Sequence, residues 1–428
     1  MLILPPARPP TRVADRYPPE SIMDTTTSII ARDEKYGAHN YHPLPVVIEK
    51  AQGVWVTDPE GKKYLDFLSA YSAVNQGHRH PKVIQALKDQ ADRCTLTSRA
   101  FHNNVMGRFL ERLCKYTGFE MALPMNTGAE ACETAMKLAR RWGVEKKGVK
   151  NGNQEIIVCE ENFHGRTISI ISFSTDPDAR INYGPYTPGF KIVPYDDAKA
   201  IEKAITPNTV AVFVEPIQGE AGVIVPAAGY LKEVRRLCTA HNVLFIADEI
   251  QTGFCRTGKK FACDHEGVRP DVMTLGKALG GGVYPVSAVV ADHEIMNVFT
   301  PGTHGSTFGG NPRAAAVAIA ALDVLDDEKL DERSARLGKK LVDGLKGIRC
   351  PRLQKIRGKG LLVAAVFDKG FEAWDTCVAL KENGLLAKQT HGNIIRFAPP
   401  LVISEAEIDQ ALGIVKRVFE SVPLETVA

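Results

Sequence analysis

The feature that most constrains the fold is an alternation of short apolar runs with amphipathic segments, which begins near residue 120. The apolar runs have the length of β-strands; they are MALPMN, QEIIVCEE, TVAVFVEP, VLFIADE, DVMTLGK and PVSAVVAD. Segments with helical periodicity, such as AEACETAMKLARRW and GYLKEVRRLCTAHN, separate some of them. Strands that are apolar throughout are typical of a parallel or mixed sheet covered by helices on both faces. The sequence therefore predicts an α/β fold.

The two ends of the chain depart from this pattern. Residues 46–68 alternate like strands around the turn at 58–61, and a helix is expected to begin at Pro81. After Pro312 a long helix leads to strand-like runs in KIRGKGLLVAAVF, LLAKQT and IIRFAPP. We therefore expect four parts: a proline-rich flexible arm (1–22), a segment that joins the small domain (23–69), a large α/β domain (70–328) and a C-terminal small α+β domain (329–428).

Length and composition exclude several classes of protein. The 428 residues are enough for two to three domains, and 53 basic against 50 acidic residues give a net charge of +3. That balance argues against binding to nucleic acid or to a membrane surface, and no apolar run approaches the roughly 20 residues of a membrane span. The pair His78 and His80 lacks further ligands at a recognisable spacing, so we expect no metal.

The cysteines bear on the compartment. There are nine, without a C-x-x-C pair, which indicates reduced thiols inside a cell. We therefore expect a cytoplasmic protein. The mitochondrial matrix is the alternative, because the first 20 residues carry arginines and few acids, although their prolines oppose a targeting helix.

Two charged residues stand at the ends of apolar runs. Asp248 ends VLFIAD, and Lys277 ends VMTLGK just before a glycine-rich turn. An ionised carboxylate costs several kcal/mol to bury unpaired, so a cationic group is expected to meet Asp248. A third strand end, NTGAE at 126–130, opens a helix whose free N–H groups suit a phosphate. In open α/β sheets, ligands bind outside the carboxyl ends of the strands, where these three ends would meet.

Together the three strand ends indicate pyridoxal 5'-phosphate as a cofactor. Its phosphate would lie at the helix N-terminus, its protonated ring nitrogen would pair with Asp248, and its aldehyde would form a Schiff base with Lys277. Taken singly, Asp248 could be a strand-end cap and Lys277 a solvated loop residue. Their combination favours the cofactor.

Several stretches of the chain resemble the pyridoxal-phosphate aminotransferases of fold type I, in the subgroup that transfers ω-amino groups. The most specific are EPIQGE at 215–220, ADEIQTG at 247–253 and LGK at 275–277. KYGAHNYHPLPVV, SAYSAVNQGH, LTSRAF, STDP, HGSTFGGNP, GLLAKQTHG and IIRFAPPLVI also fit. The likeness runs from about residue 35 to 418. It implies a large domain whose mostly parallel central sheet is sandwiched by helices, plus a small α+β domain from both chain ends.

The resemblance also implies roles around the cofactor. Phe163 would stack on the ring, and Gln251 would hydrogen-bond the phenolic oxygen. Gly128 and Ala129 would give N–H groups to the phosphate. Thr307, in HGSTFGG, would reach the phosphate of the other subunit, so that a homodimer shares its active sites.

The substrates implied by the resemblance are L-ornithine and 2-oxoglutarate, with L-glutamate as a product. Ornithine must present its terminal amine, whereas glutamate presents its α-amine with the α-carboxylate close by. One pocket therefore needs a cation for that carboxylate which can be neutralised when ornithine binds. Arg396 and Glu220 are expected to form this pair. A plain structural salt bridge is the alternative for them.

Three further residues bear on substrate choice. Arg166 is expected to hold the distal carboxylate of ornithine, with Tyr41 and Tyr71 near its α-amine, although both tyrosines could simply pack. N-acetylornithine and 4-aminobutyrate remain alternative substrates. His164 stands where animal-type sequences have Trp, and FHGRT is also typical of acetylornithine aminotransferases. Tyr71 favours ornithine, because those relatives are expected to have a smaller or aliphatic residue there. A nucleotide-binding module is disfavoured, because the P-loop and strand-linked G-x-G-x-x-G patterns are absent.

Overall fold

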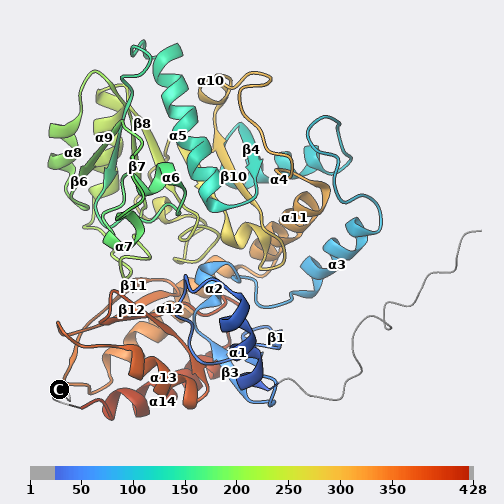
Figure 1. Cartoon of the computed structure of the whole chain (residues 1–428), viewed down its shortest axis with the longest axis vertical. Helices are drawn as coiled ribbons and strands as arrows, with labels where there is room; N and C mark the ends of the chain where they lie inside the picture. Colours follow the sequence, from blue (N-terminus) through green and yellow to red (C-terminus); the bar gives the residue numbers. More distant parts are fainter. Residues whose placement is uncertain (1–24, 424–428) are drawn as a thin grey trace, which may run out of the picture.

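The computed structural model describes residues 25–423, so the predicted arm at 1–22 lies outside the described residues. The centre of the molecule is a seven-stranded mixed sheet (Figure 1). Its strands, in spatial order, are β4 (Met121–Met125), β10 (Ser287–Ala291), β9 (Val272–Leu275), β8 (Leu244–Asp248), β7 (Thr209–Val214), β5 (Glu155–Cys159) and β6 (Phe190–Val193). β10 runs in the opposite direction to the other six strands of this sheet. Each of the six apolar runs forms one strand, as predicted, and β6 was not predicted.

Helices cover both faces of this sheet, which explains why its strands are apolar throughout. Helix α5 (Gly128–Glu145) packs on one face, where it contacts residues such as Ile246 of β8. Helices α8 (Ala198–Ala204) and α9 (Tyr230–Ala240) pack on the other face, where they contact Phe245 of the same strand. Because successive side chains of a strand point to opposite faces, each strand contributes to two hydrophobic clusters.

A capping box fixes the start of α5 at the carboxyl end of β4. The Thr127 hydroxyl accepts the N–H of Glu130 at 3.2 Å, and the Glu130 carboxylate accepts the N–H of Thr127 at 2.8 Å. The N–H groups of Gly128 and Ala129 have no hydrogen-bond partner among the described residues. The positive end of α5 is therefore aimed, with free donors, at the edge of the sheet where the parallel strands end.

Three further helices pack together beside β4 and β10; they are α3 (Pro81–Ala91), α4 (Met106–Thr117) and α11 (Pro312–Asp327). The predicted helix starts at Pro81 and Pro312 are confirmed. Shorter helices connect the strands; they are α2 (Ser69–Ser72), α6 (Ile168–Ile171), α7 (Pro177–Arg180) and α10 (His293–Met296).

Two four-stranded sheets lie below the central sheet in Figure 1. One is antiparallel and contains, in order, β11 (Leu353–Lys359), β12 (Leu362–Phe367), β15 (Ile394–Phe397) and β14 (Lys388–Thr390). The other contains β1 (Lys50–Gln52), β2 (Trp55–Thr57), β3 (Lys63–Asp66) and β13 (Leu385–Leu386). In this second sheet, β13 from the C-terminal part pairs in parallel with β3 from the N-terminal part. The remaining helices here are α1 (Thr26–Tyr36), α12 (Leu330–Lys346), α13 (Trp374–Glu382) and α14 (Glu405–Glu420).

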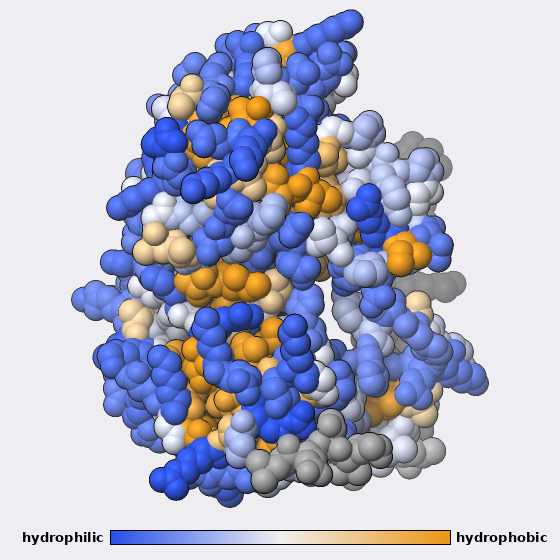
Figure 2. All heavy atoms as spheres, turned by 90° about the vertical axis from the view of Figure 1, so that its left-hand side faces the viewer, coloured by the Kyte–Doolittle hydropathy of each residue, from blue (hydrophilic) through white to orange (hydrophobic). Residues whose placement is uncertain are grey.

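The surface is mostly polar. Figure 2 shows hydrophilic side chains over most of one face, with smaller apolar groups between them. Within residues 25–423, no helix combines the length and the hydropathy needed to cross a bilayer.

Arg256 ties the central sheet to the other parts of the chain. Its side chain is 0% exposed, and Nη1 donates to the carbonyls of Leu361 at 2.9 Å and Pro399 at 2.7 Å. Nη2 donates to the side chain of Asn75 at 2.5 Å. Burial lowers the pKa of Arg256 to about 9. The guanidinium therefore depends on these neutral acceptors, which come from three separate segments.

We expect Arg256→Leu to lower the midpoint of thermal unfolding by about 3 °C or more, because it strands three buried acceptors. The control is Arg236→Leu on α9. Among residues 25–423, the exposed side chain of Arg236 forms its ion pair with Glu233. That change should shift the midpoint by no more than about 1 °C. Equal shifts in scanning calorimetry would show that Arg256 does not link the segments.

Candidate active site

A cavity of about 200 Å³ lies at the carboxyl ends of β5, β7, β8 and β9. The structure brings seven of the predicted site residues into its wall: Gly128, Ala129, Phe163, Glu220, Asp248, Gln251 and Lys277. The other lining residues are His164, Gly165, Glu215, Ile217, Ile250 and Thr252. Because these strands are parallel, residues that follow them meet at one edge of the sheet even though they are far apart in sequence.

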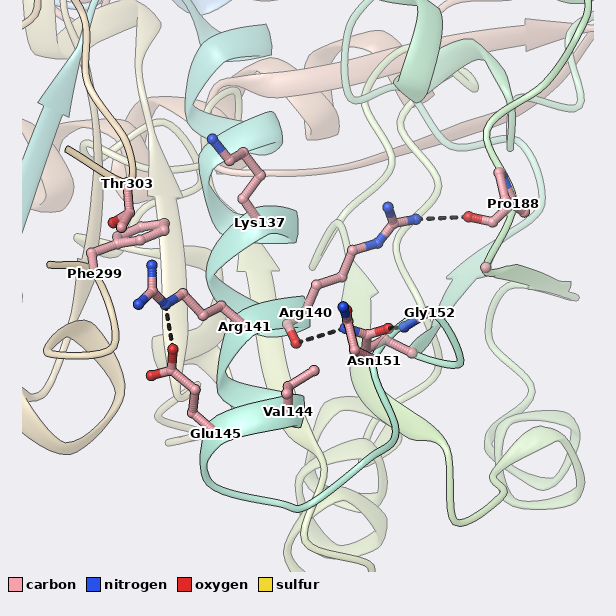
Figure 3. Close-up of a pocket in the computed structure, with 12 residues that line it drawn as sticks. Lys137, Arg140, Arg141, Val144, Glu145, Asn151, Gly152, Pro188, Phe299 and Thr303 are labelled. Atoms are coloured by element: carbon pink, nitrogen blue, oxygen red, sulfur yellow. Dashed lines mark hydrogen bonds and ion pairs between the residues drawn. The ribbon is translucent and has the colours of Figure 1, made fainter.

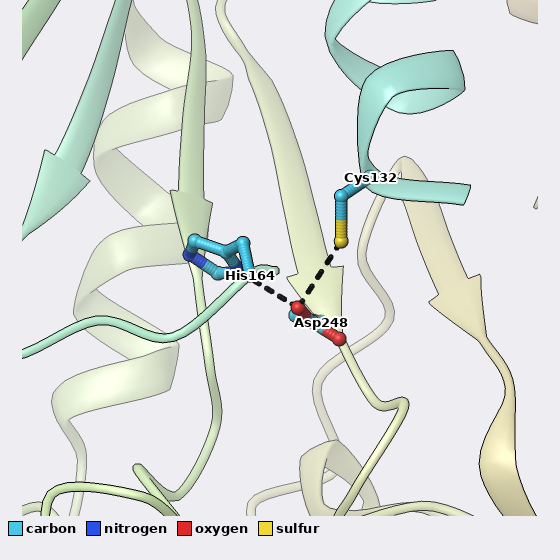
Figure 4. Close-up of side chains that lie close together, drawn as sticks. All are labelled: Cys132, His164 and Asp248. Atoms are coloured by element: carbon cyan, nitrogen blue, oxygen red, sulfur yellow. Dashed lines mark hydrogen bonds and ion pairs between the residues drawn. The ribbon is translucent and has the colours of Figure 1, made fainter. Parts of the chain in front are cut away.

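Asp248 ends β8 inside this wall and is 5% exposed. Its Oδ2 accepts hydrogen bonds from His164 Nδ1 at 2.6 Å and Cys132 Sγ at 3.4 Å (Figure 4). Its Oδ1 accepts the N–H of Ile250 at 3.0 Å and the hydroxyl of Thr274 at 3.1 Å. Burial raises the pKa of Asp248, but the hydrogen bond from His164 and the other donors outweigh it and hold the pKa below its ordinary value. The carboxylate is therefore ionised.

His164 is the protein's own polar partner of Asp248. The ring is stacked on Phe213 with centroids 4.0 Å apart, and Nε2 is buried without a hydrogen-bond partner among residues 25–423. Nδ1 carries a hydrogen and donates it to Asp248. His164 therefore supplies one of the hydrogen bonds that stabilise the buried charge of Asp248. Cys132, His164 and Asp248 lie close enough to hold a metal ion, but this hydrogen bond occupies the nearer ring nitrogen.

Lys277 lies across the cavity, just after β9. Its backbone has a left-handed φ of 46°, which is rare outside glycine and often marks a functional position. Nζ makes no hydrogen bond with the described residues and reaches the cavity. Burial lowers the pKa of Lys277 below its ordinary value, although Glu220 and Asp248 act in the opposite sense. An amine with a lowered pKa loses its proton more readily and becomes a better nucleophile.

Glu220 and Arg396 form an ion pair at one side of the cavity. Arg396 Nη1 lies 2.9 Å from Glu220 Oε1, and the side-chain amide of Gln251 donates to the same oxygen at 2.9 Å. The guanidinium of Arg396 is buried and lies 4.9 Å from the ring centroid of Tyr71. Burial raises the pKa of Glu220, but Arg396 and Lys277 draw it down to about 2. Both members of the pair are therefore charged.

Tyr71 belongs to a strained stretch of backbone. All four residues at 69–72 have positive φ, between 46° and 73°. Such a run is costly outside glycine, so it must be held by its surroundings, and strain of this kind clusters at ligand sites. Burial raises the pKa of Tyr71, and Glu220 adds to the effect. Tyr41 is 73% exposed and lies near enough to contribute to the same shift.

The remaining predicted residues lie outside the cavity wall. Arg166 is exposed, with its guanidinium 5.7 Å from the ring centroid of Phe163. Thr307 is exposed and does not line the cavity.

Gln251, in the cavity wall, donates its side-chain amide to Glu220, and its Oε1 is buried without a partner among the described residues. That amide leaves no room for a side chain at Gly219, where a Cβ would lie 1.5 Å from Oε1.

Sequence reasoning overlooked four residues of this site. Glu215 directly follows β7 and lines the cavity, so the rule that singled out Asp248 applied to it as well. Burial, with Asp248 nearby, raises the pKa of Glu215 well above its ordinary value. Thr274 was visible as a hydroxyl in an otherwise apolar strand. Cys132 and His164 gave weaker signals, because only the fold shows that they contact Asp248.

A larger cavity, about 570 Å³, lies along the outer half of α5 (Figure 3). Lys137, Arg140 and Arg141 line it, but their charged groups diverge. Arg140 reaches the carbonyl of Pro188, and Arg141 points to the other side of the helix to pair with Glu145. The cations that line this cavity therefore do not converge on one point, and the cavity offers no equivalent of the arrangement of Asp248 and Lys277.

The family is decided by comparison with known proteins. A family model described as aminotransferase class-III matches residues 36–419. The chain belongs to the class-III aminotransferases. The predicted resemblance and the predicted fold type I architecture are confirmed.

Individual relatives of this class-III aminotransferase cover nearly the whole chain. The ornithine aminotransferase of Brevibacillus brevis is 59% identical over 93% of this chain and 99% of its own. The crystal structure of acetylornithine aminotransferase from Elizabethkingia anophelis is 51% identical, with a TM-score of 0.86 over 93% and 100% of the chains. The ornithine aminotransferase of Toxoplasma gondii, crystallized with oxidized glutathione, is 48% identical, with a TM-score of 0.92 over 94% and 95%. In that structure pyridoxal phosphate partly occupies the active site.

The cofactor of this class-III aminotransferase is pyridoxal 5'-phosphate, as predicted, and the cavity fits it. The free N–H groups of Gly128 and Ala129 offer donors for a phosphate. The ionised Asp248 offers a negative charge for a protonated ring nitrogen. Lys277 offers an amine of lowered pKa for the aldehyde.

We expect Asp248→Asn to lower kcat by two or more orders of magnitude, because an amide cannot hold a proton on the ring nitrogen. The nearly unchanged size of the side chain should leave the fold intact by circular dichroism. The control is Asp178→Asn, an exposed acid of α7 outside the cavity, which should retain parental turnover. If kcat for Asp248→Asn were within a few-fold of the parent value, Asp248 would have only the structural role of a strand-end cap.

Proposed function

We propose that this aminotransferase transfers the terminal amino group of L-ornithine to 2-oxoglutarate. The products are L-glutamate and glutamate 5-semialdehyde, which cyclises to pyrroline-5-carboxylate. The observation that carries the proposal is the ion pair between Glu220 and Arg396 at the side of the cavity, beneath Tyr71. The relatives named ornithine aminotransferase, which match almost end to end, support it.

The chemistry divides between the cofactor and the chain. Pyridoxal phosphate, when bound, supplies an aldehyde that carries the amino group and a ring that withdraws electrons from the reacting carbon. Asp248 holds a proton on the ring nitrogen, and Gly128 and Ala129 bind the phosphate through their N–H groups. Phe163 packs against the ring, and Lys277 Nζ moves the proton at the reacting carbon. Gln251, which donates to Glu220 and lines the cavity, would hydrogen-bond the phenolic oxygen.

The ion pair allows one cavity to serve two unlike substrates in a ping-pong sequence. Ornithine brings no carboxylate next to its reacting amine, so an unpaired Arg396 would be left without an anion in a buried site. Glu220 supplies that anion. When glutamate or 2-oxoglutarate binds, its α-carboxylate replaces Glu220 on Arg396 with two parallel hydrogen bonds. The exposed part of Glu220, whose side chain is 26% exposed, gives it room to move aside.

The far end of ornithine is recognised by groups at the mouth of the cavity. Arg166 binds its carboxylate, and Tyr71 and Tyr41 contact its α-amine. This arrangement disfavours 4-aminobutyrate, which has no α-amine to contact. N-acetylornithine is the second candidate, because the Elizabethkingia anophelis relative carries the name acetylornithine aminotransferase at 51% identity.

We propose further that the enzyme is a cytoplasmic homodimer. The exposed Thr307, beside the 46% exposed Phe308, would reach the phosphate site of the partner subunit. All nine cysteines are free thiols, and the similar ornithine aminotransferases of Brevibacillus brevis and Bacillus subtilis are bacterial.

We expect Glu220→Ala to slow the half-reaction with ornithine at least tenfold, because Arg396 is then left unpaired beside a substrate that cannot neutralise it. The half-reaction with glutamate should be kept or accelerated. Single-turnover absorbance measurements separate the two halves. The control is Glu161→Ala, an exposed acid outside this cavity. An equal loss in both halves would assign Glu220 and Arg396 to a structural salt bridge.

We expect the wild type to have its highest kcat/KM for ornithine among ornithine, N-acetylornithine and 4-aminobutyrate, each with 2-oxoglutarate. The cyclised product can be trapped as a coloured adduct.

Tyr71→Ile should lower kcat/KM for ornithine by about 10- to 100-fold through loss of a polar contact, while activity toward 4-aminobutyrate is spared. The control Tyr71→Phe separates the hydroxyl from the ring. A wild-type preference for N-acetylornithine would overturn the proposed substrate and leave the cofactor chemistry standing.

A further inference from the structure

Two polar side chains in the core point at Asp248 and have no part in the chemistry above. Thr274 and Cys132 are both 0% exposed, and they come from β9 and α5, on either side of the acid. Thr274 is the Cα partner of Asp248 in the parallel pairing of β8 with β9. Cys132 lies one helical turn after Gly128, which places its thiol beneath the phosphate-binding end of α5. Buried polar side chains without a role are rare, so these two contacts need an explanation.

Their hydrogen bonds are two of the four that the carboxylate accepts from the protein. Asp248 receives these four donors two on each oxygen. The donors come from four different segments, so the carboxylate cannot rotate without losing several bonds. Replacing a donor by an apolar group would leave the same buried charge with less compensation.

We propose that Thr274 and Cys132 are positioning residues that act through Asp248, holding its carboxylate ionised and oriented for the ring nitrogen of pyridoxal phosphate. The proposal rests on the role proposed for Asp248 and is independent of which amine is the substrate. The two residues differ in strength. The Thr274 hydroxyl is the better donor at 3.1 Å, whereas the Cys132 thiol is a weak donor at 3.4 Å.

The proposal predicts a pH dependence of cofactor binding. The pKa of Asp248 is depressed, so its ionised form is present at neutral pH and is lost as the pH falls through that pKa. Removing a donor raises the pKa, so the loss occurs at a higher pH. The titratable groups that face Asp248 are Cys132 on α5, His164 after β5, Glu215 after β7 and Lys277 after β9. Variants at Thr274 leave all four in place.

The test uses matched pairs of variants in the full-length protein freed of cofactor. Thr274→Val keeps the shape and removes the hydroxyl, whereas Thr274→Ser keeps the hydroxyl. Affinity for added pyridoxal phosphate is measured from acid pH below the ordinary pKa of an aspartate up to neutral pH by fluorescence quenching, with circular dichroism at each pH to confirm the fold. For Thr274→Val we expect the acid-side midpoint to rise by roughly one pH unit. Thr274→Ser should match the parent, and KM for ornithine should be unchanged in both.

The pair Cys132→Ala and Cys132→Ser repeats the test on the other side of Asp248. This pair also serves as the test if Thr274→Val does not fold. The alanine variant should show a smaller shift of the same sign, and the serine variant none. Equal shifts within both pairs would show that the side chains only fill space, and no shift in Thr274→Val would also overturn the proposal. Neither result bears on the substrate, which the comparison of amines tests separately.

Discussion

The buried negative charge of Asp248 is the constraint around which the active site is organised. Burying an ionised carboxylate costs several kcal/mol, and four hydrogen bonds from four segments offset that cost without cancelling the charge. His164 donates one of these hydrogen bonds. The carboxylate also lines the cavity, where we propose that it meets the protonated ring nitrogen of the cofactor. A parallel sheet is well suited to this arrangement, because it gathers the ends of several strands around one point.

The charges of Asp248 and Arg396, at the two ends of the cavity, are balanced in different ways. At Asp248 the charge is held by four donors from four segments, as suits a cofactor that stays in place. At Arg396 the charge is matched by Glu220, which we propose moves aside when the second substrate binds. The left-handed stretch at 69–72 places the ring of Tyr71 against Arg396 from a separate part of the chain.

The sequence predicted those features that follow from local pattern. Apolar runs marked six of the seven central strands, and charges at their ends marked Asp248 and Lys277. Contacts that depend on how elements pack could not be read in the same way. The bond from Cys132 to Asp248 depends on the rotation of α5, and the full burial of Arg256 depends on carbonyls more than 100 residues away. The role proposed for Thr307 would require a second subunit, which no pattern within one chain can place.

The pairing of β13 with β3 sets an order of events during synthesis. β3 ends at Asp66, yet its parallel partner β13 begins at Leu385. The pairing of these two strands therefore cannot form until almost the whole chain has been synthesised. The strands of the central sheet, by contrast, all lie between Met121 and Ala291. A growing chain can thus assemble the wall that binds the cofactor well before Arg396 leaves the ribosome. The ion pair between Glu220 and Arg396, to which we assign the choice between substrates, is therefore formed late.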